Sequence, residues 1–146
     1  MKWVTWKNIG VDRMACIWLI RRWIDPAAEF SFLPIGNNPL PKYGEPFDIP
    51  GARYSHHGGH CTFYALLNEN NINDPTLSRI AQMVDEADEV QEVTVEPAAL
   101  GLDLVCRGLR QISTDDFEAL ERGNLIYDAL YAQLKSDSNI SGTDGN

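Results

Sequence analysis

The sequence predicts an α+β fold, in which a few short N-terminal strands form a small sheet packed with about five helices. Segments with strand-like composition fall within the first 55 residues, whereas the C-terminal half carries only helical periodicity. The chain shows no βαβ alternation and no glycine-rich phosphate loop, so a nucleotide-binding fold is not expected.

The N-terminal part should combine short strands with one buried helix. Residues 2–6 and 29–33 have the composition of strands, and residues 52–55 are a candidate third strand. A helix is expected over residues 10–23, where apolar side chains on nearly all sides indicate burial. The five prolines of residues 34–50 indicate a long loop before the third strand.

Four further helices are expected in the remainder of the chain. Thr62 can cap the first of them, and Asp74-Pro75 supplies an N-cap and a first helical residue for the second. The third opens at Pro97 and should end near Gly108 or Leu109. The fourth follows the capping residues 113–116.

Length and composition indicate a single domain at residues 1–135 and a disordered tail at residues 136–146. With 146 residues, of which 44% are hydrophobic, the chain can bury a core without disulfide or metal staples. The last eleven residues are rich in Ser, Asp, Asn and Gly, and Ile140 is their one apolar side chain.

Charge and cysteine content predict a cytoplasmic protein that contacts neither membranes nor, directly, nucleic acid. Lys and Arg number 12 against 21 Asp and Glu, which gives a net charge of −9 and no basic footprint for phosphates. The sequence shows no signal peptide and no apolar run long enough to span a bilayer. Three widely spaced cysteines indicate reduced thiols.

The segment of residues 55–61 is the strongest candidate site. The three histidines of the chain, His56, His57 and His60, fall within five positions, and Cys61 follows them. Imidazole and thiolate are preferred ligands of transition metals, with zinc or iron expected first. Cys61 also precedes a predicted helix, whose N-terminus favours the nucleophilic thiolate and hence a catalytic or redox role. The alternative is a solvated polar loop with Cys61 packed in the core.

Further metal ligands would have to come from later helices. Asp88 continues an apolar stripe, and an inward-facing acid is costly unless it is paired or ligates a cation. A solvated position for Asp88 is equally compatible with the pattern, and for Asp85 it is the favoured interpretation. Asp128 is another candidate ligand, although a solvated helix face is the simpler interpretation there.

Three arginines of the first helix, Arg13, Arg21 and Arg22, are candidates to hold an anion. Ion pairing with the many carboxylates of the chain is the simpler role for them. The other two cysteines, Cys16 and Cys106, lie in apolar surroundings and are expected in the core.

Several blocks of the chain, taken in order, point to a known family. They are Lys2-Trp3-Val4-Thr5, residues 12–25 and 28–34, Phe47-Asp48-Ile49-Pro50-Gly51, Ser55-His56-His57-Gly58, Cys61-Thr62-Phe63, Asp74-Pro75, Ala87-Asp88 and residues 127–131. Their order and spacing over residues 2–134 resemble the C-terminal domain of ChrB, the chromate-resistance family. His56, Gly58 and Cys61 match the central motif of that family, whereas His57 and His60 stand at variable positions.

The resemblance implies a part in chromate resistance, where family members act as chromate-responsive regulators with an additional N-terminal region. We expect this chain to lack that region and to supply the effector or redox half, which would bind a small oxyanion or a metal ion. Three functions remain open. They are a stress protein that binds a transition metal or that senses or reduces chromate, a small metal- or thiol-dependent enzyme, and a non-catalytic interaction domain that could form a homodimer.

Overall fold

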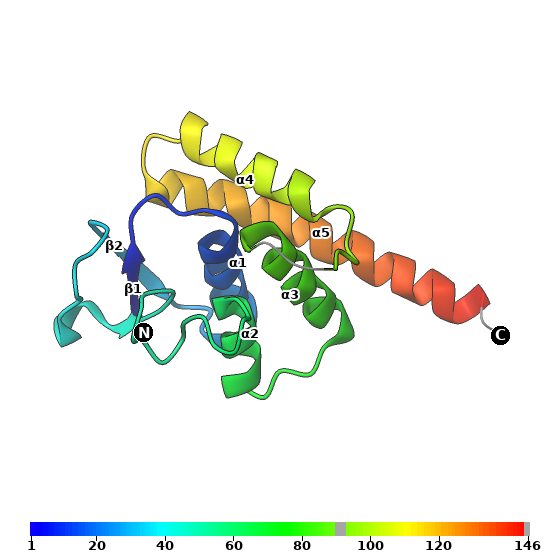
Figure 1. The fold of residues 1–146 in the computed structure, drawn as a ribbon, viewed down its shortest axis with the longest axis horizontal. Coiled ribbons are helices and arrows are strands. Elements are labelled where there is room, and N and C mark those ends of the chain that lie inside the picture. The colour runs from blue at the N-terminus through cyan, green and yellow to red at the C-terminus, as the bar shows by residue number, and fades with distance from the viewer. Residues whose placement is uncertain (90–92, 145–146) are drawn as a thin grey trace.

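The structure is a computed structural model that describes residues 1–89 and 93–144. A three-stranded parallel sheet lies on one side of a helical body, with strand order β2-β1-β3 (Figure 1). The central strand β1 (Lys2–Trp6) pairs with β2 (Glu29–Leu33) along its whole length and with β3 (Glu45–Pro46) near its middle.

The first two strands and the helix between them form one parallel crossover. Helix α1 (Val11–Leu19) continues into a π-helical turn, η1 (Ile20–Ile24), so the two together match the predicted helix closely. The expectation that the chain lacks βαβ alternation is wrong for this unit, because β1 and β2 are parallel and need such a crossover. A single unit leaves no repeated pattern in the sequence, which is why it was not recognised.

The other helical elements follow along the chain, joined by loops. They are the short 3₁₀ turn η2 (Pro41–Tyr43), α2 (Thr62–Glu69), α3 (Pro75–Asp88), α4 (Ala99–Ile112) and α5 (Asp116–Asp144). Helices α4 and α5 lie side by side, and the end of α5 projects beyond the body (Figure 1). The predicted α+β class with a helical C-terminal half is confirmed. Within the described residues, no helix has both the length and the apolarity needed to cross a membrane.

Helix α1 is the centre of the core. It contacts α2, α3, α4 and α5, and every one of its residues except Arg13 is buried. Fully burying a large apolar side chain such as Ile17 contributes roughly 1.5–3 kcal/mol, so this helix holds its neighbours together. The predicted burial of the first helix is confirmed. Asp12, in its first turn, is carried into the interior with it.

The third strand differs from the prediction. Residues 52–55 make only one isolated bridge, between Tyr54 and Phe47, and the strand is instead β3 inside the predicted loop. Asp48 and Gly51 have positive φ angles of 52° and 86°, so the chain turns sharply there and cannot extend the strand.

The C-terminal tail also differs. Helix α5 runs to Asp144, whereas composition predicts disorder from residue 136. Residues 136–140 are exposed and lie beyond Leu134, so they are helical without packing against the core. Residues 145–146 lie outside the described residues, and the domain boundary near residue 135 stays a prediction.

Gly44 allows β3 to lie close against β1. Its φ is 103°, and a Cβ there would overlap the backbone carbonyl of Lys2, whereas Gly36 has a φ of 94° and open space around it. Replacing Gly36 by Ala should cost about 1–2 kcal/mol of backbone strain. Replacing Gly44 by Ala should cost about 1–3 kcal/mol more, because it adds the overlap. Urea denaturation of both variants measures the difference, and equal losses of stability would contradict the close approach.

Candidate functional site

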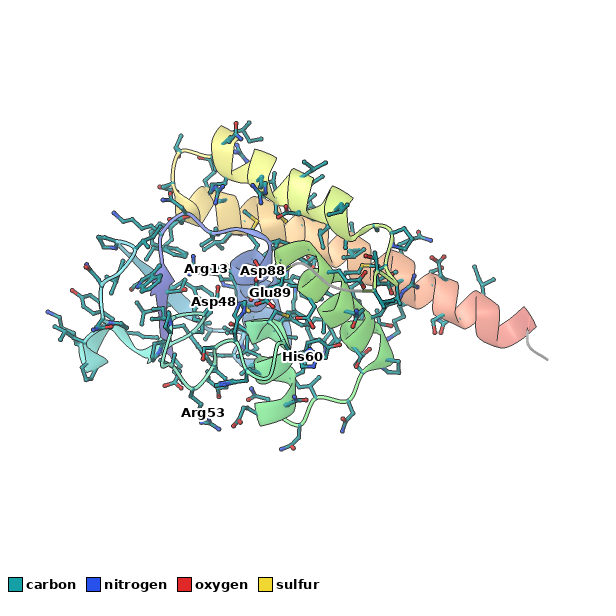
Figure 2. The ribbon with its side chains drawn as sticks, viewed as in Figure 1. Arg13, Asp48, Arg53, His60, Asp88 and Glu89 are labelled. Carbon is teal, nitrogen blue, oxygen red and sulfur yellow. The ribbon has the colours of Figure 1, made fainter. Side chains whose placement is uncertain are left out.

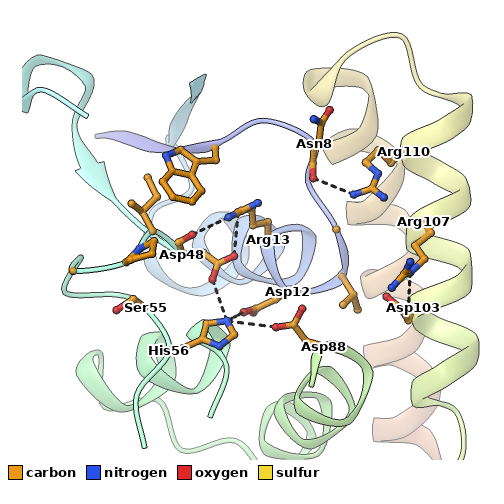
Figure 3. A pocket seen from close by; sticks show the side chains of 16 residues that line it. Asn8, Asp12, Arg13, Asp48, Ser55, His56, Asp88, Asp103, Arg107 and Arg110 are labelled. Atoms are coloured by element: carbon orange, nitrogen blue, oxygen red, sulfur yellow. Dashed lines mark hydrogen bonds and ion pairs between the residues drawn. The ribbon is translucent and has the colours of Figure 1, made fainter. Parts of the chain in front are cut away.

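One histidine and four carboxylates converge where α1, α3 and two loops meet. Figure 3 shows the histidine with three of the carboxylates, those of Asp12, Asp48 and Asp88. His56 Nε2 lies 3.2 Å from Asp12 Oδ2, 3.3 Å from Asp48 Oδ1 and 3.4 Å from Asp88 Oδ2. Its other ring nitrogen, Nδ1, lies 2.7 Å from Glu89 Oε1. We call these five residues the His56 cluster. Asp12 is buried, whereas His56 and Asp88 reach the surface. In Figure 2 Asp48, Asp88 and Glu89 lie close together and Arg53 lies apart from them.

The spacing in the cluster is that of ligand atoms around one ion. The contacts of Nε2 are longer than the roughly 2.7–2.9 Å of a charge-assisted N–H···O hydrogen bond. Ligand atoms that share a metal at about 2.0–2.2 Å lie roughly 3.0–3.4 Å apart, depending on coordination geometry. Asp12, Asp48 and His56 each offer a ligand atom within 4.8 Å of the others, and His56, Asp88 and Glu89 form a second such group.

Asp12 joins α1 to the N-terminus of α2. Its Oδ2 accepts the backbone N–H of Thr62 at 3.1 Å, and its Oδ1 accepts that of Phe63 at 3.3 Å. Free amides and the helix dipole make a helix N-terminus a favourable place for an anion. Burial, and then the neighbouring Asp48 carboxylate, nevertheless raise the pKa of Asp12, and the contact with His56 only partly offsets them.

Asp48 is held in place from two sides. Arg13 Nε lies 3.1 Å from Asp48 Oδ2, and Arg13 Nη2 donates to the Asp48 backbone carbonyl at 3.0 Å. The Thr62 hydroxyl donates to Asp48 Oδ1 at 2.7 Å. Thr62 was predicted to be the N-cap of α2, but Cys61 occupies that position and Thr62 is the first helical residue. Its hydroxyl is therefore free to orient Asp48.

The cluster favours positive charge. Hydrogen bonds to Asp12 and Asp48 raise the pKa of His56 to about 11, so the free imidazole is protonated at neutral pH. Burial, and then repulsion from Asp12 and Asp48, raise the pKa of Asp88 to about 6. The carboxylates resist ionising together, and a divalent cation among them would relieve that repulsion.

The surroundings of Cys61 do not favour the predicted reactivity. Its side chain is buried and its Sγ lies 3.9 Å from the carbonyl oxygen of Ala81. Burial, and then the Asp12 charge, raise its pKa far above the ordinary value, which opposes the predicted thiolate. A catalytic or metal-binding role for Cys61 stays a prediction. The backbone amides at the start of α2, which would stabilise a thiolate, donate to carboxylates instead. The amide of Cys61 donates to Asp85 Oδ1 at 2.6 Å, and those of Thr62 and Phe63 donate to Asp12.

The other two histidines lie apart from the cluster. His60 Nδ1 lies 2.8 Å from Asp85 Oδ2, and His57 Nε2 lies 3.1 Å from the Arg53 carbonyl oxygen. Both line a separate hollow of about 340 Å³ together with Cys61. Asp85 is buried, so its interpretation as a solvated residue is wrong. Metal binding by His57 or His60 stays a prediction, and the structure does not bring them to His56.

The remaining predicted residues form ion pairs. Asp128 accepts from Trp18 Nε1 at 2.7 Å and from Arg22 Nη2 at 2.8 Å, which places it in a different cluster from His56. Arg21 pairs with Glu121 at 2.9 Å. Of the three arginines proposed to hold an anion, only Arg13 lines the cavity beside the His56 cluster, and it pairs with Asp48 there.

Sequence reasoning missed Asp12, Asp48 and Glu89 as members of the cluster. Asp12 had a usable signal, because an acid in the first turn of an otherwise buried helix needs a partner or a cation. Asp48 lies in a proline-rich loop between Phe47 and Ile49, which are both buried, so its neighbours fix its position. Glu89 follows Asp88 at the end of α3 and carries no signal of its own.

The cluster opens into a cavity of about 850 Å³. Its lining combines the cluster with an apolar side and a third side from α4 (Figure 3). A ligand in this cavity would therefore lie beside any ion that the cluster holds.

Fold and site together define an α+β domain with a histidine-carboxylate cluster at the base of a cavity. The sequence matches the family described as "ChrB, C-terminal domain" over residues 3–134. It is 34% identical over 137 residues to Protein ChrB of Cupriavidus metallidurans, covering 92% of this chain and 41% of that protein. The chain therefore belongs to the ChrB C-terminal domain family, which confirms the resemblance found in the sequence. It spans about two fifths of the length of that relative. No solved structure matches it significantly.

All three thiols, Cys16, Cys61 and Cys106, are buried, and burial is the first cause of a raised pKa at each. In the native protein at pH 8 they should react with a thiol reagent at least roughly a hundredfold more slowly than in denatured protein, because reaction requires opening of the core. A chromogenic disulfide reagent measures this, with three thiols in urea as the control. One rapidly reacting thiol in the folded protein would contradict the assignment.

Proposed function

We propose that this domain binds one divalent transition-metal ion through Asp12, Asp48, His56 and Asp88, and that this metal centre is its contribution to chromate resistance. Glu89 accepts a hydrogen bond from the Nδ1–H of His56 and thereby turns Nε2 toward the three carboxylates. A carboxylate that orients a histidine in this way is typical of metal ligands.

The observation that carries the proposal is the convergence of three carboxylate oxygens on one imidazole nitrogen at 3.2–3.4 Å. The pKa values of Asp12 and Asp88 are raised, because burial and the neighbouring carboxylates disfavour their ionised forms. A divalent cation would offset that free-energy cost. A solvated polar loop would not need Asp12, which is buried. Holding a cation explains why the four side chains are brought together.

The donor set limits the choice of ion. Three carboxylates and one imidazole, without a thiolate, suit Zn²⁺, Fe²⁺ or Mn²⁺ better than the soft ion Cu⁺. Reduction of chromate by a protein thiol has less support, because Cys61 is buried and its pKa is raised. An accessible metal at the base of a cavity instead favours ligand binding or metal-assisted chemistry.

Removing cluster side chains should weaken metal binding selectively. We expect His56→Gln and Asp88→Asn to bind Mn²⁺ and Zn²⁺ at least about tenfold more weakly, since each loses a ligand. Glu89→Gln should lose roughly 10–100-fold through misorientation of His56. Calorimetric titration of the metal-free protein measures these affinities.

Asp103→Asn is the matched control for this series. Asp103 is a carboxylate on the wall of the same cavity, but it pairs with Arg107 and lies outside the His56 cluster. Its variant should bind metal as the wild type does. Failure of the wild type to bind either Mn²⁺ or Zn²⁺, or equal affinity in the three cluster variants and Asp103→Asn, would contradict the proposal.

Metal binding should release a proton and strengthen with pH. The pKa of His56 is raised to about 11 in the free protein, whereas a metal-bound Nε2 carries no proton. Binding at pH 7 therefore displaces this proton, and the affinity should rise about tenfold per pH unit between pH 7 and 9. Below pH 6, protonation of Asp88 should make the dependence steeper. Titration in two buffers of different ionisation enthalpy counts the protons, and a buffer-independent heat would sink the assignment of His56 as a ligand.

A further inference from the structure

The cavity beside the His56 cluster has walls of three chemical kinds. The cluster forms one end, and α4 contributes Arg107 and Arg110 on the opposite side (Figure 3). The lining also has an apolar part, which consists of Trp6, Val11, Ile49 and Pro50. The volume of about 850 Å³ is within the roughly 300–1,000 Å³ typical of sites for small organic molecules.

Arg110 stands out among the arginines of this acidic chain. Seven of the eight arginines form ion pairs with carboxylates in the described residues, and Arg110 does not. Its contact there is a hydrogen bond from Nη1 to the backbone carbonyl of Asn8 at 3.3 Å. Arg110 lies in the last turn of α4, where the helix dipole favours a cation. The dipole does not explain why the Arg110 side chain lines the cavity.

Arg107 lies beside Arg110 on the same face of α4, three residues earlier. Its Nε donates to Asp103 at 2.8 Å, so this ion pair tethers the side chain by one edge. The terminal nitrogens of its guanidinium have no partner among the described residues and can still donate. Two guanidinium groups at this spacing can bind the oxygens of one carboxylate or phosphate group.

We propose that this cavity binds a small organic anion, whose carboxylate or phosphate group pairs with Arg110 and Arg107 while its other end reaches the metal of the His56 cluster. The inference rests on the proposed function, since the metal supplies the second contact. The apolar lining and the volume favour an organic ligand over a bare inorganic oxyanion, which would leave most of the cavity to water.

The test uses 4-carboxyphenylphosphonate as the probe, which carries an anionic group at each end of an apolar ring, with calorimetry on the full chain loaded with Mn²⁺. The probe should bind more tightly than inorganic phosphate, because its ring covers the apolar lining, and more tightly with Mn²⁺ than without it. Arg110→Ala should weaken probe binding about tenfold or more, because it removes a charged hydrogen-bond donor. Its affinity for Mn²⁺ should stay within about twofold of the wild-type value. Arg107→Ala should act in the same direction.

Arg53→Ala is the control, because Arg53 pairs with Glu69 at 2.9 Å and does not line this cavity. Arg110 is exposed, so its variants should fold, and Arg110→Lys should recover part of the affinity if charge is what matters. If the wild type binds Mn²⁺ but Arg110→Ala does not change the affinity for the probe, this inference is wrong and the proposed function stands. The same holds if the probe binds no more tightly than inorganic phosphate. Absence of Mn²⁺ binding in the wild type would instead contradict the proposed function.

Discussion

The fold and the site both depend on one buried carboxylate, that of Asp12. It lies in the first turn of the central helix α1 and accepts the first amides of α2, from Thr62 and Phe63. An unpaired carboxylate in such surroundings would be costly, and so would the buried amides without an acceptor. Each satisfies the other, and the pairing sets α2 against α1. The loop just before α2 then brings His56 to the same carboxylate.

The electrostatic character of the site follows from that geometry. Asp48, Asp88 and Glu89 surround the same imidazole, and Arg13 is the other cation in contact, through Asp48. Nearby carboxylates repel one another more strongly in a partly buried site than in water. The cluster therefore favours any cation that can enter it, and the positive charge of α4 lies across the cavity. A site with opposite charges at its two ends can orient a ligand that has both a metal-binding and an anionic end.

The comparison of Cys61 with Asp12 shows why the site could be only partly predicted. A cysteine ahead of a helix is a sound signal for a thiolate, but it assumes that the helix amides are free. Here Asp12 and Asp85, from α1 and α3, already accept them. His56 and Asp88 were recognised as candidates, because histidine and an inward-facing acid each stand out in a local pattern. Asp48 has no such pattern and reaches the site through a turn with positive φ.

By itself, the sequence determined the elements that depend on local patterns. The strands at residues 2–6 and 29–33, the buried first helix, the Asp74-Pro75 start of α3 and the ChrB family were all readable from composition, capping and the order of motifs. Only the tertiary structure decided which of the polar residues meet. Asp12, Asp48, His56 and Asp88 come from four segments of the chain, and their distances depend on helix packing. Local sequence fixes the direction of a side chain along its own element, whereas the partner that it meets is fixed by how separate elements pack together.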